Sequence, residues 1–211
     1  MNSQFPDIVR SAPMLVVRQI KEWAEIIIDF ETRNQYEIRS ENGERLAFVI
    51  EKDKGLLSTL ARVFLRSHRP LEVDVLDKSS KPMYHLSRKF FFFFSDLNIH
   101  DSAHQKTGSI HRRFGIVYKK YDLHDELNQV FARVKAPIWR LWTFPVINTS
   151  GQVTAKITKK WQGLLKEALS DADSFVVEYG DIPWSLNQRL VLLFTAVSID
   201  FDFFEDNDAN N

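Results

Sequence analysis

The segment from Leu186 to Phe204 constrains the fold more than any other part of the chain. When it is placed on a helix, apolar residues lie around its whole circumference. One face consists of Leu190, Leu193, Phe194, Val197 and Phe201. A helix that is apolar on every side has to be buried, and Ser185 is a suitable N-cap residue before the apolar run. We therefore predict a buried helix that begins next to Ser185.

The same segment is a poor candidate for a membrane span. Its uncharged run extends from Leu190 to Ile199, about half of the ~20 apolar residues that a spanning helix needs. Asp200 and Asp202 follow this run, and each would cost about 2.5 to 3.5 kcal/mol near the centre of a bilayer. We therefore expect the helix to lie inside the protein, with no transmembrane span.

Most of the remaining chain has the pattern of β-strands. Short apolar or alternating runs are separated by turn residues about every eight to twelve positions, which is typical of an all-β sandwich or barrel. The predicted strands are Ile26–Glu31, Tyr36–Arg39, Leu46–Glu51, Leu71–Leu76, Met83–Ser87, Phe90–Ile99, Ser109–Phe114, Ile116–Tyr121, Gln129–Val134, Trp139–Ile147, Val153–Thr158 and Ser174–Tyr179. Two segments have helical spacing: Leu56–Arg66 predicts a short amphipathic helix or a turn, and Trp161–Ser170 predicts a short amphipathic helix. In such a chain, a fully apolar helix fits best inside a closed barrel.

Composition narrows the possible functions. The 211 residues suffice for one core, and 44% hydrophobic with 27% charged residues is ordinary globular composition. Lys plus Arg and Asp plus Glu both number 28, so nucleic acid or anionic lipid would have to be met by a local patch. The absence of cysteine excludes disulfides, thiolate zinc sites and cysteine nucleophiles. We also find no phosphate-cradling glycine loop, metal-binding histidine pair or serine elbow, and so predict no enzymatic turnover.

Several segments resemble the phospholipid scramblase family in sequence, order and approximate spacing, from about Trp23 to Glu205. The matching segments are Asn34–Ile38 with Gly43, Arg69–Leu71, Trp139 with Trp142–Phe144, Ile157–Ala168, Ser170–Phe175 and Ile199–Glu205. The resemblance implies a mainly β, tubby-like closed barrel of about 12 antiparallel strands around a central buried C-terminal helix. We expect three parts: an N-terminal segment, residues 1–22, without signal-peptide features; the barrel domain, residues 23–205; and an acidic flexible tail, residues 206–211.

The resemblance also implies a function. We expect a cytoplasmic, peripherally membrane-associated protein that binds phospholipids or moves them without ATP, as a monomer or an oligomer. The alternative is a soluble interaction or nucleic-acid-binding barrel, because members of this family and of the tubby group are implicated in transcription. The balanced charge counts against a strong nucleic-acid binder.

The chain departs from the animal members of the family at one informative place. Where their acylated cysteine cluster would lie, this chain has Phe90 to Phe94. In a strand such a run points side chains to both faces, so some must lie outside the barrel. Either another segment covers them, or Phe91, Phe92, Phe93 and Phe94 form an apolar patch for lipid, with Arg88 and Lys89 beside it for anionic headgroups.

Basic residues gather on several predicted strands. The candidates for a phosphate-binding patch are Arg112, Arg113, Lys119, Lys120, Lys159 and Lys160. The tubby resemblance implies phosphoinositides as ligands of such a patch. A solvated strand face is the simpler interpretation of the same residues.

A calcium site is the one metal site that the resemblance suggests. Asp171 to Ile182 lies where the family's proposed calcium-binding segment falls, with Asp171 and Asp173 at its first and third positions. Val176 stands where a calcium loop needs glycine, and Ile182 where it needs a bidentate glutamate. The alternation favours a strand, and weak calcium binding at the two aspartates stays open.

Asp200 and Asp202 require partners if the C-terminal helix is buried. A carboxylate inside a protein is costly unless it is paired or hydrogen-bonded. We predict that a basic, tryptophan or backbone donor reaches Asp200 inside the barrel mouth, and that Asp202 is partly exposed.

Overall fold

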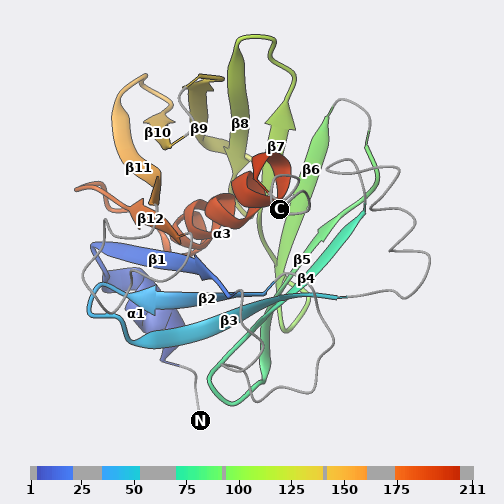
Figure 1. Cartoon of the computed structure of the whole chain (residues 1–211), viewed down its shortest axis with the longest axis vertical. Coiled ribbons are helices and arrows are strands. Elements are labelled where there is room, and N and C mark those ends of the chain that lie inside the picture. Colours follow the sequence, from blue (N-terminus) through green and yellow to red (C-terminus); the bar gives the residue numbers. More distant parts are fainter. Residues whose placement is uncertain are drawn as a thin grey trace.

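The computed structural model describes residues 4–20, 35–52, 70–91, 94–139, 142–160 and 174–204. Within these residues, twelve antiparallel strands form one closed barrel (Figure 1). The strands are β1 Met14–Gln19, β2 Gln35–Ser40, β3 Arg45–Glu51, β4 Leu71–Leu76, β5 Pro82–Arg88, β6 Ser95–Asp101, β7 Lys106–Arg113, β8 Tyr118–His124, β9 Val130–Pro137, β10 Thr143–Asn148, β11 Val153–Lys160 and β12 Ser174–Glu178. Each strand pairs with the next one in sequence, and β1 closes the barrel against β12. The predicted fold class is confirmed.

Helix α3, Leu186–Phe203, fills the barrel. Every residue from Arg189 to Asp202 is buried, and the core joins the helix to the inward side chains of the strands. Ser185 is the N-cap as predicted, and its side chain forms a capping box with Gln188. The helix passes so close to β7 that a Cβ atom added to Gly108 would come within 2.5 Å of Val191.

The barrel begins earlier in the chain than the sequence predicted. β1 lies before residue 23, where we placed the start of the domain, and we predicted no strand there. Helix α1, Phe5–Ser11, packs against α3 and adds Phe5 and Val9 to the core. Arg189 on α3 donates a hydrogen bond from Nε to the carbonyl oxygen of Val9, at 2.6 Å. The first twenty residues therefore contribute both a strand and a cover for the barrel.

Two other strands begin later than the sequence predicted. β6 begins at Ser95, so the described phenylalanines of the run, Phe90, Phe91 and Phe94, lie in the connection before it and not in a strand. Similarly, β10 begins at Thr143 and not at Trp139. Phe92 and Phe93 lie outside the described residues, as do the predicted strand Ile26–Glu31, the helices Leu56–Arg66 and Trp161–Ser170, the aspartates Asp171 and Asp173, and the tail 206–211.

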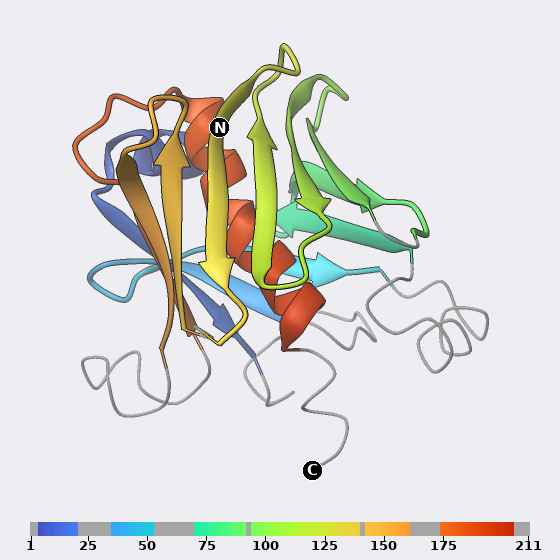
Figure 2. The same cartoon turned by 90° about the horizontal axis from the view of Figure 1, so that it is seen from above.

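The two ends of the barrel differ (Figure 2). At one end, here called the turn end, five hairpins join β2–β3, β4–β5, β6–β7, β8–β9 and β10–β11. Four of them open with a residue whose Oδ1 accepts hydrogen bonds from the backbone N–H groups two and four positions later. These residues are Asp77, Asp101, Asp125 and Asn148. The opposite end, called the mouth end, holds the last turn of α3 and the connections that leave β5, β7 and β9.

Candidate functional site

The last turn of α3 brings two buried carboxylates to the mouth end. Asp200 Oδ2 accepts a hydrogen bond from Tyr36 Oη at 2.6 Å, and Lys159 Nζ lies 3.3 Å from Asp200 Oδ1. Lys159 on β11 is itself buried. The prediction that a basic donor would reach Asp200 inside the barrel is confirmed.

Asp202 is even more enclosed, because its side chain has no exposed surface. Arg88 Nη1 donates to Asp202 Oδ1 at 2.8 Å, and Tyr121 Oη donates to Oδ2 at 2.7 Å. Arg112 Nη1 lies 3.5 Å from the same Oδ1. The prediction of a partly exposed Asp202 was wrong, because strands β5, β7 and β8 all aim polar side chains at it. Burial, and then the Asp202 charge, raise the pKa of Tyr121 well above its usual value, so its hydroxyl remains a donor.

Lys119 on β8 is the unusual cation of this end. The residue is only 8% exposed, and its ammonium group faces aromatic rings. Nζ lies 4.1 Å from the centroid of Phe203 and 5.3 Å from those of Phe144 and Phe204. No described residue forms a hydrogen bond or an ion pair with Lys119. Burial, helped by the charge of Arg112, lowers the pKa of Lys119 to about 8.

Aromatic rings and cations alternate around this cluster. Arg112 stacks over Phe203 with 5.0 Å between Cζ and the ring centroid, and Arg88 stacks over Phe91 at the same distance. Lys159 Nζ lies 3.8 Å from the centroid of Phe204. We call the set Arg88, Arg112, Lys119, Lys159, Asp200 and Asp202 the cationic mouth. Its four cationic side chains outnumber its two carboxylates, so its net charge is positive at neutral pH.

The six residues predicted as a phosphate patch separate into two groups. Arg112, Lys119 and Lys159 point inward and belong to the cationic mouth. Their neighbours Arg113, Lys120 and Lys160 point outward, because successive residues of a strand face opposite sides. Of the two cations predicted beside the phenylalanine run, Arg88 points inward to Asp202, whereas Lys89 is exposed.

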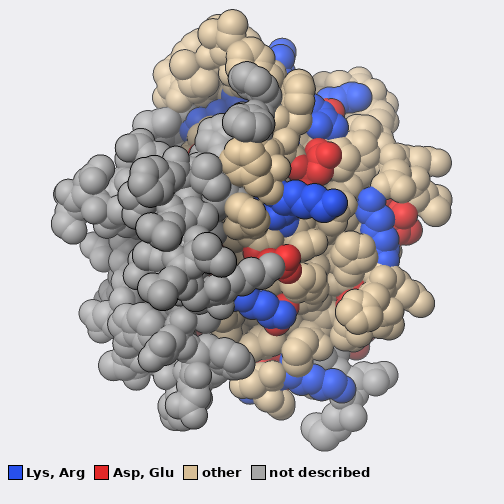
Figure 3. Space-filling model, turned by 90° about the vertical axis from the view of Figure 1, so that its right-hand side faces the viewer, with Lys and Arg blue, Asp and Glu red and all other residues tan. Residues whose placement is uncertain are grey.

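The outward-facing charges are largely balanced. Arg113 and Arg133 share Asp122 at 3.1 Å each, and Lys156 pairs with Glu178 at 2.8 Å. On the face of the molecule drawn in Figure 3, basic and acidic side chains lie beside each other. For Arg113, these contacts favour the interpretation as part of a solvated strand face. Among the described residues, positive charge is also in excess outside the mouth, where Arg18, Arg39 and Arg45 share the single carboxylate of Glu37.

Exposed apolar side chains lie at the mouth end, in the connections that leave β5, β7 and β9. Ile116 is 78% exposed in the β7–β8 connection, and Trp139 is 66% exposed after β9. We call the following set the apolar rim: Phe90, Phe94, Phe114, Ile116, Val117, Ile138, Trp139 and Trp142. Phe91 differs from its neighbours, because it is buried beneath Arg88 and Arg112. Part of the phenylalanine run is thus covered and part is exposed.

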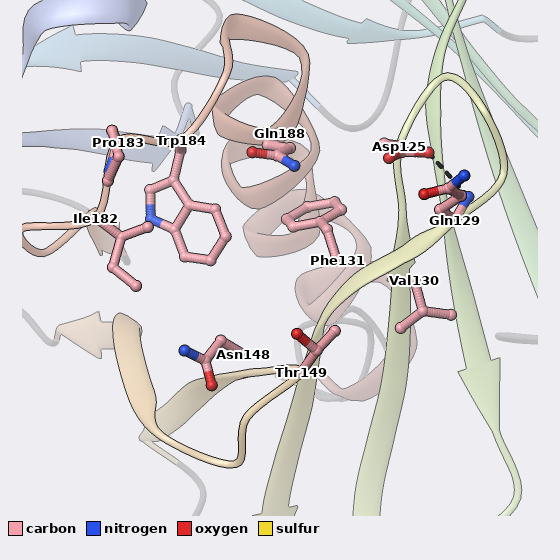
Figure 4. A pocket seen from close by; sticks show the side chains of 10 residues that line it. All are labelled: Asp125, Gln129, Val130, Phe131, Asn148, Thr149, Ile182, Pro183, Trp184 and Gln188. Carbon is pink, nitrogen blue, oxygen red and sulfur yellow. Dashed lines mark hydrogen bonds between the residues drawn. The ribbon is translucent and has the colours of Figure 1, made fainter.

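The turn end carries a pocket of about 450 Å³ (Figure 4). Phe131 and Trp184 pack edge to face on one side of it, with 5.6 Å between ring centroids. The residues that line it are Asp125, Gln129, Val130, Phe131, Asn148, Thr149, Ile182, Pro183, Trp184 and Gln188. None of them is basic, and Asp125, Asn148 and Gln188 already bind backbone groups in turns and caps. The pocket therefore lacks the charge that a phosphate group requires.

The described part of the chain contains no group of three or more His, Asp or Glu residues placed to hold a metal ion. It also contains no helix long and apolar enough to cross a membrane. Asp171 and Asp173, the predicted calcium ligands, are not among the described residues, so that prediction stays untested.

The sequence did contain a signal that the side chains of the cationic mouth point into the barrel, because every second side chain of a strand points to the same side. Arg88 continues the series Tyr84 and Leu86, which both face the core. The predicted strand ended at Ser87, one residue too early. Lys119 precedes the inward Tyr121 in the same way. Tyr36 and Tyr121, the hydroxyl donors to the two aspartates, were not predicted as site residues, and no sequence motif connects them to α3.

Comparisons with known proteins indicate first the fold class of this chain and then its family. The chain resembles an X-ray structure of a protein from Arabidopsis thaliana, with a TM-score of 0.50 and 16% identity, over 93% of this chain and 99% of the other. This likeness places the fold among tubby-like barrels. The model of the family described as Scramblase matches residues 3–206. The chain therefore belongs to the scramblase family.

Curated relatives agree with this family. The chain is 28% identical to altered inheritance rate of mitochondria protein 25 of Saccharomyces cerevisiae, over 93% of this chain and 72% of that protein. It is 24% identical to a phospholipid scramblase family protein of Schizosaccharomyces pombe, over 97% and 62% of the two chains. It is 26% identical to phospholipid scramblase 1 of Mus musculus, over 90% and 61%. The chain thus spans between 61% and 72% of the lengths of these three relatives.

Proposed function

We propose that this protein works at the surface of phospholipid membranes, where its mouth end faces the lipid and the cationic mouth meets anionic headgroups. Membership of the scramblase family supports a lipid-directed function without chemical turnover. The observation that carries the proposal is that exposed apolar side chains, in the connections after β5, β7 and β9, lie at the same end of the barrel as a net positive cluster.

Each part of this end matches a layer of the membrane interface. Tryptophan and other aromatic side chains prefer the depth of the headgroups, where one edge is apolar and the other is wet. Apolar side chains such as Ile116 gain free energy when they enter the boundary of the acyl chains. Cations near the surface gain about 1 kcal/mol each from anionic lipid. The apolar rim and the cationic mouth therefore favour the same orientation.

The structure also bears on how a headgroup would move between leaflets. A headgroup needs a polar route through or beside ~30 Å of hydrocarbon. Helix α3 fills the barrel with apolar side chains, so a route through the interior would require its removal. We propose that lipid moves beside the docked protein, in a bilayer that an assembly of docked molecules thins locally.

Vesicle flotation tests the orientation. The double variant Ile116→Asp with Trp139→Asp should lose binding to vesicles of phosphatidylcholine with phosphatidylserine. The matched control places the same two charges at the turn end, through Leu127→Asp and Val153→Asp, whose side chains are 69% and 65% exposed. The control should float as the wild type does. Equal flotation of the two double variants would contradict the proposed orientation.

A dithionite assay of lipid flip in the same vesicles tests the activity, with and without calcium. Flip that is lost in the variant of the apolar rim and kept in the control supports translocation by the docked protein. Flotation of the wild type without flip would limit the function to lipid binding. Flip that requires calcium would direct attention to Asp171 and Asp173, with Asp171→Ala and Asp173→Ala as the variants to compare.

A further inference from the structure

We infer that Arg112 and Lys119 form a binding site for a phosphate monoester, and that the cationic mouth prefers such a headgroup to one that carries an ammonium group. This inference deepens the proposed function and rests on it, because the mouth end must face the lipid for a headgroup to reach the site.

The two carboxylates of the mouth are already engaged. Both oxygens of Asp200 have partners, Tyr36 and Lys159, and both oxygens of Asp202 have partners, Arg88 and Tyr121 among them. A headgroup ammonium, as in phosphatidylcholine or phosphatidylethanolamine, would have to displace one of these donors to reach a carboxylate. Because each aspartate of the cationic mouth already binds described partners, neither is ready to receive an ammonium group.

Arg112 and Lys119 are the cations that remain after this pairing. Arg112 Nη1 is buried and donates no hydrogen bond within the described chain, and its contact with Asp202 is long, at 3.5 Å. Lys119 is more than nine-tenths buried, its Nζ lies over the rings of Phe144, Phe203 and Phe204, and no described residue forms a hydrogen bond with it. A buried polar group without a hydrogen-bond partner is costly, so a ligand that accepts from either group gains more than it would at the surface.

The two cations also lie together. They belong to the paired strands β7 and β8, and both stack on the ring of Phe203, at 5.0 Å for Arg112 and 4.1 Å for Lys119. The charge of Arg112 is one cause of the lowered pKa of Lys119. An anion between the two groups would relieve this repulsion. Arginine can bind two oxygens of one phosphate, and the lysine ammonium adds a compact charge beside it.

A phosphate monoester fits this pair better than a diester. A monoester carries about 1.5 to 2 negative charges at pH 7 and three strong acceptor oxygens. Two cations can therefore be matched by one ligand. Phosphatidylserine has a diester phosphate with one negative charge, and its carboxylate is accompanied by an ammonium group, which the net positive mouth disfavours. Phosphatidate among lipids and glycerol phosphate in solution share the required chemistry.

The test compares binding to vesicles of phosphatidylcholine that contain either phosphatidate or phosphatidylserine. The wild type should prefer phosphatidate. Lys119→Met keeps the length and removes the charge, and it should reduce the partition coefficient on phosphatidate vesicles by about tenfold, the loss expected for one charge-assisted hydrogen bond. Its binding to phosphatidylserine vesicles should change little. Arg112→Met should act in the same direction.

Lys120→Met is the matched control, because it removes the same charge from the adjacent, outward-facing position. It should change binding to both kinds of vesicle equally and by less than about twofold. Lys119→Arg restores the charge and should restore most of the preference. Similar thermal unfolding of the four variants and the wild type shows that the differences are not caused by loss of fold.

Calorimetry with glycerol phosphate and without vesicles separates this inference from the proposed function. Binding that is lost in Lys119→Met but kept in Lys120→Met supports the site, even if docking on membranes fails. If this binding is strong and phosphatidate vesicles show no preference, the ligand is the soluble phosphate. Wild-type protein that floats equally on phosphatidate and phosphatidylserine vesicles, and that binds no glycerol phosphate, would overturn the inference while leaving membrane docking intact.

Discussion

The turn end and the mouth end of the barrel are built from the same strands, yet their bonds differ in range. At the turn end, Asp77, Asp101, Asp125 and Asn148 each bind backbone groups two and four residues later. At the mouth end, Tyr36 reaches Asp200 across 164 positions of sequence, and Arg88 reaches Asp202 across 114. The turn end can form locally, whereas the mouth exists only when the barrel has closed around α3. The end that depends on the complete fold is also the one that concentrates charge and exposed apolar surface.

Leu193→Asp should have the largest effect on stability. It should unfold the whole barrel, so that neither end keeps its structure. Leu193 is completely buried in α3, where an unpaired carboxylate has no partner. The loss should exceed about 4 kcal/mol and unfold the domain, because the helix shares one hydrophobic core with residues of every strand. Circular dichroism would show it as the loss of a cooperative thermal transition. A variant that folds with near-native stability would contradict the account of α3 as the core of the barrel.

Asp202→Asn should separate the two ends most clearly. The change keeps the shape of the side chain and leaves Arg88 and Arg112 without their shared carboxylate, which should reduce the free energy of unfolding by about 3 to 5 kcal/mol. Urea unfolding measures the loss. The same chemical change at the turn end, Asp125→Asn, retains the accepting oxygen and should cost less than about 1 kcal/mol. Similar losses for the two variants would contradict the contrast.

Asp125→Ala should have a smaller, local effect. It removes the acceptor for the backbone N–H groups of Leu127 and Gln129, in a hairpin where water can replace it. We expect a loss of about 1 kcal/mol in urea unfolding. Binding to phosphatidate vesicles should not change, since the hairpin lies at the opposite end from the mouth. A change in that binding would show that the two ends are coupled.

The smallest expected effect is on how the free energy of unfolding depends on pH. The pKa of Lys119 is lowered from 10.5 to about 8 in the folded protein, so the unfolded chain holds this proton more tightly. The contribution of Lys119 to the free energy of unfolding should therefore be lowest below pH 8 and rise as the pH increases from about 8 to 10.5. Lys119→Met should remove this rise, whereas Lys120→Met should retain it. Parallel pH profiles for the two variants would contradict the burial of the Lys119 ammonium.

The sequence was sufficient to predict the elements whose signal is local or repeated. The apolar circumference of the segment from Leu186 to Phe204 predicted its burial, and the alternation of short runs predicted a β-sandwich or barrel, of which the buried helix favoured the barrel. Ser185 was recognised because an N-cap is defined by its immediate neighbours. These features need no knowledge of which distant residues meet.

The remaining features depended on closure of the barrel. Residues 14–19 became a strand because β2 and β12 border them, not because of a strong signal of their own. Arg112 and Lys119 face inward, contrary to the usual rule that charged residues of an antiparallel sheet face water. The groups that they face arrive from the end of the chain: Asp202 lies 3.5 Å from Arg112, and the rings of Phe203 and Phe204 face the Lys119 ammonium. Sequence reasoning named these cations together with their neighbours and could not tell which of them face inward.

Quenching of tryptophan fluorescence by brominated lipids tests the central claim, that the mouth end faces the membrane, most directly. Two single-tryptophan proteins are compared, with Trp139 in the apolar rim or Trp184 at the turn end, and with the other tryptophans replaced by phenylalanine. With vesicles that contain anionic lipid, Trp139 should be quenched strongly and Trp184 should not. Quenching of Trp184 instead, or equal quenching of both, would contradict the orientation.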